Sequence, residues 1–168
     1  MTIIDYNGSG IWSADAVLAR YALYARNYGI STLRDLRPLE HTEGEKKWIY
    51  PVMARVIEGL ESGDLACAEI GVEFIEEDLS FAFGRVLKSN TARALRRNPL
   101  TDELKERIRK RVVGMLEDGY LPREYRQYAK LARKIGLGKW LAEIKERVPL
   151  DNPWAQRYYK YFEEHGSH

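Results

Sequence analysis

Apolar residues recur along most of this chain with the spacing of an amphipathic helix. The clearest case follows Thr101, a residue suited to a helix N-cap, and ends before Gly119. Ser13 and Asn152 are N-cap candidates for two further helices, the first of which closes near Gly29. In the clearest helix the apolar residues follow one another at three or four positions and share one face: Leu104, Ile108, Val112, Met115 and Leu116.

Two other segments are harder to interpret. Thr42 and Glu45 match a capping box, which predicts a helix through Trp48 with a kink or a late start at Pro51. In residues 65–79 the apolar side chains alternate with other residues, as in a strand, but a subset of them also recurs every three or four residues, as in a helix. Since alanine and glutamate favour the helix, and no comparable strand is visible as a partner, we expect a helix there.

The pattern as a whole predicts an all-α fold in a single domain spanning residues 1–168. We expect seven to nine short helices packed as irregular antiparallel hairpins, with a HEAT-like arrangement as one possibility. Residues 80–87 and 90–97 read as two short helical pieces, which Asn98 and Pro99 bring to an end. Residues 166–168 are expected to form a disordered tail.

Composition excludes several classes of protein. The chain has 168 residues, of which 45% are hydrophobic and 31% charged, and a mean hydropathy of −0.48. Its longest uncharged stretch, residues 6–14, is too short to span a bilayer, and the amino terminus does not resemble a secretory signal. The single cysteine, Cys67, can form no internal disulfide. We therefore expect a cytoplasmic globular protein that is neither membrane-bound, collagenous, disulfide-rich nor disordered.

The net charge of +2 conceals a segregation of charge along the chain. Residues 1–84 contain 7 basic and 14 acidic side chains, whereas residues 85–139 contain 16 basic and 6 acidic ones. Either the two parts neutralise each other in the folded protein, or one of them attracts a charged macromolecule. The sequence leaves both alternatives open.

Four glutamates form the candidate acidic site. If residues 65–79 are helical, these side chains share one helix face. The face could be solvated, could be neutralised by cations of residues 85–139, or could bind a basic partner protein. No glutamate here has a histidine three residues later, as a di-metal bundle site would require, so we expect no metal or cofactor. The four residues are Glu69, Glu73, Glu76 and Glu77.

The basic segment carries the candidate nucleic-acid site. Residues 128–137 resemble the first helix and turn of a helix-turn-helix, a resemblance that implies DNA binding. After the turn, Leu141 and Ile144 come one position earlier than that motif requires. Basic side chains could neutralise phosphates with or without the motif. The candidates are Arg93, Arg96, Arg97, Lys105, Arg109 and Arg126.

Aromatic residues near the carboxyl end form a stripe at helical spacing. Trp154, Tyr158 and Tyr161 follow the i, i+4, i+7 pattern, which is most often a core face. Tryptophan and tyrosine also anchor protein interfaces and stack on unpaired bases. The sequence does not separate these uses.

Together these features favour a non-catalytic binding protein that acts through a charged surface on a macromolecular partner. A protein partner is the first hypothesis, and a basic protein would suit the acidic site. An inhibitor, an immunity-type protein or an adaptor is the kind of molecule expected. A nucleic-acid-binding regulator that uses residues 85–139 is the second. An enzyme built around Glu69 and Glu73 is the third.

Overall fold

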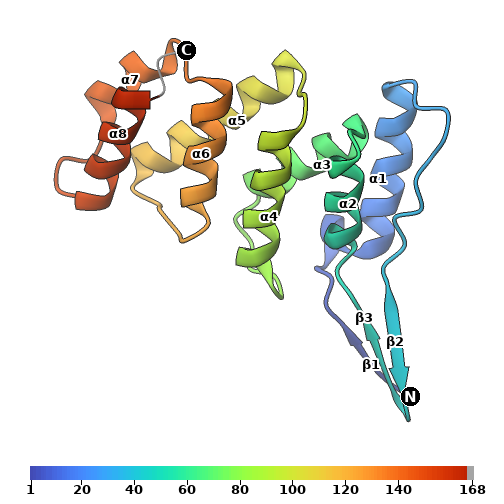
Figure 1. The fold of residues 1–168 in the computed structure, drawn as a ribbon. Helices are drawn as coiled ribbons and strands as arrows, with labels where there is room; N and C mark the ends of the chain where they lie inside the picture. Colours follow the sequence, from blue (N-terminus) through green and yellow to red (C-terminus); the bar gives the residue numbers. More distant parts are fainter. Residues whose placement is uncertain (166–168) are drawn as a thin grey trace.

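The computed structural model describes residues 1–165, and this part of the chain is predominantly helical (Figure 1). The all-α prediction with seven to nine helices is therefore confirmed. Residues 166–168, for which we expected a disordered tail, lie outside the described part. The eight α-helices are α1 (Ala14–Asn27), α2 (Val52–Glu61), α3 (Leu65–Glu76), α4 (Gly84–Arg97), α5 (Asp102–Asp118), α6 (Tyr125–Ile135), α7 (Trp140–Arg147) and α8 (Pro153–His165).

The helix ends follow from local capping. The side-chain oxygen of Thr101 accepts a hydrogen bond of 3.2 Å from the amide of Leu104, so α5 begins where the sequence predicts. Gly119 ends the same helix with a φ of 70°, a left-handed conformation that glycine adopts at little cost. Ser13 caps α1 in the same way, through a bond of 3.2 Å from the amide of Ala16.

The helices stack in two layers. One layer consists of α1, α3, α5 and α7, and the other of α2, α4 and α6, with each helix in contact with its neighbours in the layer. The last helix, α8, packs against α5, α6 and α7 and closes the carboxyl end of the stack. The buried side chains form one continuous core from Trp12 to Phe162. This alternation is an arrangement of stacked helical hairpins, which agrees with the hairpin packing predicted from the apolar pattern.

A small sheet at the amino-terminal end was missed by the sequence pattern. It has the order β1-β3-β2, with β1 parallel to β3 and β2 antiparallel to it, and it projects away from the helices (Figure 1). A short 3₁₀ helix (Gly10–Trp12) joins the first strand to α1. The strands are β1 (Thr2–Asp5), β2 (Glu40–Glu43) and β3 (Lys46–Ile49).

The helix predicted through Trp48 is therefore wrong. Thr42 lies in β2 and caps nothing, because Gly44 turns the chain with a φ of 60° and β3 returns beside β2. Trp48 then stacks on His41 across the two strands, with 5.5 Å between the ring centroids. The alternative of a late start is confirmed, since α2 begins directly after Pro51.

Two further predictions concern the middle of the chain. The helix expected over residues 65–79 is confirmed for residues 65–76, where Asp64 caps α3 through bonds from the amides of Ala66 and Cys67. Residues 77–79 are not helical, because the backbone becomes extended at Glu77, so Glu77 does not share the helix face as predicted. Residues 80–97 do not form two helical pieces: α4 is one helix, preceded by a segment without regular structure. Among residues 1–165, no helix combines the length and apolar character needed to cross a bilayer.

Candidate functional site

The four glutamates of the acidic cluster lie on α3 and at its end, and the fold supplies partners for them. Arg20 of α1 pairs with Glu73, with 3.0 Å between Nη1 and Oε2. Arg107 of α5 lies between two others: its Nη1 is 3.8 Å from Glu69, and its Nη2 bonds Glu76. These contacts hold α3 between α1 and α5.

Burial and hydrogen bonding set the protonation of this cluster. Burial raises the pKa of Glu69, an effect that Arg107 opposes. The pKa of Glu77 is lowered, chiefly because Trp12 Nε1 donates a hydrogen bond of 2.9 Å to its carboxylate, with a further bond from the amide of Leu79. The arrangement supports neutralisation within the fold, one of the three alternatives that the sequence left open. Glu69, Glu73 and Glu76 are therefore paired within the fold and are not free to bind a basic partner.

Cys67 behaves as a small apolar side chain. It is completely buried in α3, and burial raises the pKa of its thiol above the ordinary value. Such a thiol is inert as a nucleophile at neutral pH. Across residues 1–165, no three histidine, cysteine, aspartate or glutamate side chains are placed to hold a metal ion.

The strongest candidate site is a basic face on α4, α6 and α8. Its seven side chains belong to sequence-distant helices, and within the described residues none of them lies within 4 Å of a carboxylate. By contrast, Arg20, Arg107 and Arg111 all form ion pairs. The basic face consists of Arg93, Arg96, Arg126, Lys130, Arg133, Lys134 and Arg157.

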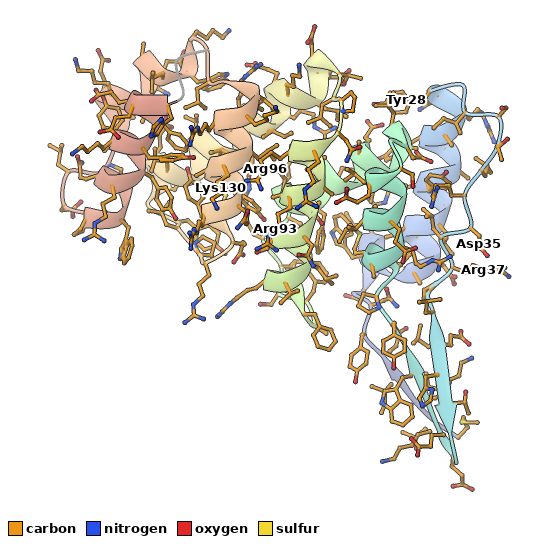
Figure 2. All side chains as sticks on the ribbon, viewed as in Figure 1. Tyr28, Asp35, Arg37, Arg93, Arg96 and Lys130 are labelled. Atoms are coloured by element: carbon orange, nitrogen blue, oxygen red, sulfur yellow. The ribbon has the colours of Figure 1, made fainter. Side chains whose placement is uncertain are left out.

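An open cleft of about 570 Å³ lies at the centre of the basic face. Figure 2 shows Arg93 and Arg96 on α4 next to Lys130 on α6, at the junction of the two helices. Five side chains from three helices line this cleft: Arg96, Lys130, Arg133, Lys134 and Tyr161. Four positive charges therefore surround one concave surface, where they reinforce the local potential.

Helical periodicity explains why these side chains point outward together. The apolar side of α6 is buried against the core through Tyr125, Tyr128, Leu131 and Ala132. The positions between these residues must face solvent, and they carry Arg126, Lys130, Arg133 and Lys134. In α4, Ala92 and Leu95 are buried, whereas Arg93 and Arg96 are half-exposed.

The fold divides the predicted phosphate-binding residues into two groups. Arg93, Arg96 and Arg126 belong to the basic face. Arg97 pairs with Glu61 of α2 at 3.5 Å. Lys105 and Arg109 lie on α5, in the other layer of helices.

Arg109 has a structural role that the sequence did not indicate. Its guanidinium donates to two carbonyl oxygens at the carboxyl end of α6, at 2.6 Å to Gly136 and 3.0 Å to Ile135. These carbonyl oxygens have no hydrogen-bond donor within the helix. Arg109 supplies the missing donors at the end of α6 and thereby stabilises the turn that follows.

Sequence reasoning missed four members of the basic face. Three of them, Lys130, Arg133 and Lys134, follow from the spacing of the apolar residues in α6, which would have been sufficient to find them. Arg157 lies outside the basic segment in sequence, and only the packing of α8 against α6 brings it to the face.

A second pocket adjoins the cleft, between α6 and α8. It has a volume of about 340 Å³ and is lined by Arg126, Ala129, Lys130, Trp154, Arg157, Tyr158 and Tyr161. The prediction that the aromatic stripe forms a core face is wrong for Trp154, which is 61% exposed. Two cation–π contacts orient the outer rings: Arg157 lies 4.9 Å from the centroid of Trp154, and Arg133 lies 5.9 Å from that of Tyr161.

The helix-turn-helix resemblance corresponds to α6 and α7. These two helices are joined by a turn at Gly136, but α7 has only eight residues and lies in the other layer. Ile144, which comes one position earlier than the motif requires, is buried in the core. The cations of the basic face lie on α4, α6 and α8, so the face does not depend on α7 as a recognition helix.

The chain matches no family model, no curated protein and no solved structure.

Proposed function

We propose that this protein binds nucleic acid without catalysing a reaction, through phosphate contacts made by the basic face. One observation carries the proposal: seven cations on α4, α6 and α8 have no carboxylate partner within residues 1–165, although the net charge of the chain is only +2. Charges held close together without counter-ions favour a polyanionic ligand, since binding releases the ions condensed on that ligand. A reducing cytoplasm, which suits the free thiol of Cys67, is part of the proposal.

The layout of the cations favours a phosphate chain over an acidic protein. Neighbouring packed helices lie about 8–10 Å apart, so side chains from three helices cover about 20 Å. Several consecutive phosphates of a nucleic acid fit along that length. The aromatic rings of Trp154 and Tyr161 lie among the cations, as in surfaces that also contact bases. A basic protein partner was suggested by the acidic face of the sequence, but Glu69, Glu73 and Glu76 form ion pairs within the fold, which weakens the case for that partner.

The proposal can be tested by charge reversal in the central cleft. We expect the triple variant Arg96→Glu, Lys130→Glu, Arg133→Glu to bind a fluorescent 20-nucleotide strand at least about 100-fold more weakly at about 50 mM salt. If all seven cations contact phosphates, the slope of log K against log salt is about −5 for the wild type and about −3 for the variant. Fluorescence anisotropy at several salt concentrations measures both quantities.

A matched control separates the basic face from net charge. The triple variant Lys110→Glu, Lys139→Glu, Lys145→Glu changes the net charge equally, at three exposed positions on or next to α5 and α7. It should keep most of the affinity. The proposal fails if the two variants lose affinity equally or if the wild type shows no binding. It also fails if poly-L-glutamate competes as well as an oligonucleotide of equal charge, since that result favours an acidic protein partner.

A further inference from the structure

The pocket between α6 and α8 differs in chemistry from the cleft beside it. Its walls are largely aromatic, from Trp154, Tyr158 and Tyr161, and its cations are Arg126, Lys130 and Arg157. A tryptophan that is 61% exposed leaves a large apolar surface in contact with water, which favours a ligand that covers it. The volume of the pocket, about 340 Å³, is at the small end of the range for ligand pockets and suits one flat ring system.

The pocket is continuous with the basic cleft, since Lys130 and Tyr161 line both. A phosphate beside Lys130 would therefore place the base attached to the same strand within reach of Trp154. The contact between Arg157 and the ring of Trp154 holds that ring in a defined orientation. In a duplex the bases are stacked and paired, so they cannot offer a free face to this ring.

Building on the proposed function, we infer that this pocket stacks an unpaired base on Trp154, so that the ligand is single-stranded nucleic acid. The phosphates of the strand lie along the basic face, and one base leaves the strand to enter the pocket. Stacking and phosphate contacts do not require a 2′-hydroxyl, so DNA and RNA single strands are both ligands.

The test compares three labelled ligands of one sequence: a DNA strand, the equivalent RNA strand and the DNA duplex. At equal salt we expect the two single strands to bind the wild-type protein more tightly than the duplex. Trp154→Ala should weaken single-strand binding about tenfold, because each stacked base contributes a factor of about five or more, and should leave duplex affinity unchanged within about twofold. The salt dependence should not change, since no charge is removed.

Two further variants control the experiment. Trp154→Phe keeps a stacking ring and should restore most of the affinity. Leu150→Ala removes another exposed apolar side chain near the start of α8, one that does not line the pocket, and should have no effect. Thermal melts followed by circular dichroism check that each variant folds.

The outcomes distinguish this inference from the proposed function. If the duplex binds as tightly as the single strands, or if Trp154→Ala leaves single-strand affinity unchanged, base stacking is excluded while phosphate binding by the basic face stands. If none of the three ligands binds at about 50 mM salt, both the inference and the proposed function fail.

Discussion

Replacement of Gly59 by alanine should destabilise the protein by about 2 kcal/mol, because the added methyl group has no room where α2 crosses α3. A Cβ at this position would lie 2.4 Å from Cys67 Sγ and 3.3 Å from the side chain of Arg34. Cys67 is completely buried, so its sulfur cannot move without displacing other core atoms. The higher helix propensity of alanine, about 1 kcal/mol, offsets only part of the overpacking.

A double-mutant cycle tests this explanation. In a Cys67→Ala background the sulfur is absent, so Gly59→Ala should be neutral or stabilising by up to about 1 kcal/mol. Urea denaturation of the four proteins gives the coupling energy, which we expect to be about 2 kcal/mol or more. An equal effect of Gly59→Ala in both backgrounds would show that the contact with Cys67 is not the cause.

Replacement of Arg107 by methionine should also lower the free energy of unfolding by about 2 kcal/mol at pH 7. Removing one partner of a buried ion pair costs about 3–5 kcal/mol, whereas exposed pairs contribute about 1 kcal/mol or less. Arg107 and its two glutamates are between one fifth and about one third exposed, which places the effect between these limits. The melting temperature should fall by about 4–8 °C for a chain of this size.

The stability lost in Arg107→Met should increase as the pH rises. Burial already raises the pKa of Glu69, and without Arg107, which opposes that effect, the folded-state pKa of Glu69 should rise further. When the pKa of a group is higher in the folded protein than in the unfolded chain, protonation of that group stabilises the fold. This contribution is fully present at a pH below the pKa of the unfolded chain, and it is lost as the pH rises through the pKa of the folded protein. The difference between variant and wild type should therefore be small near pH 4 and complete at pH 7.

Lys110→Met is the matched control, since Lys110 is exposed on the same helix and forms no ion pair within the described residues. It should change the stability by less than about 0.5 kcal/mol. A loss for Arg107→Met that is the same at pH 4 and pH 7 would contradict the electrostatic explanation. In that case packing of the arginine stem between α3 and α5 would be the cause.

The sequence by itself determined most of the helices, because the signals that begin and end a helix act over a few residues. Thr101 caps an amide three positions away, and Gly119 ends the same helix through its own backbone conformation. The helix predicted over residues 65–79 was correct as far as Glu76 for the same reason, since the choice between helix and strand depended on local propensity. The outward direction of Lys130 likewise follows from the apolar spacing within α6.

The tertiary structure alone decided which charges remain free and where the sheet forms. Thr2–Asp5 becomes a strand because residues 46–49 lie beside it in the folded protein. No local pattern in either segment predicts that the two will pair. Glu73 and Glu69 are neutralised by Arg20 and Arg107, which are 53 and 38 residues away in sequence. Electrostatic energy depends on distance in space, so a charge profile along the chain cannot separate paired cations from unpaired ones. The basic face exists because the fold brings carboxylates to Arg20 of α1, to Arg97 of α4 and to the arginines of α5. It brings none, within residues 1–165, to the seven cations of the face on α4, α6 and α8.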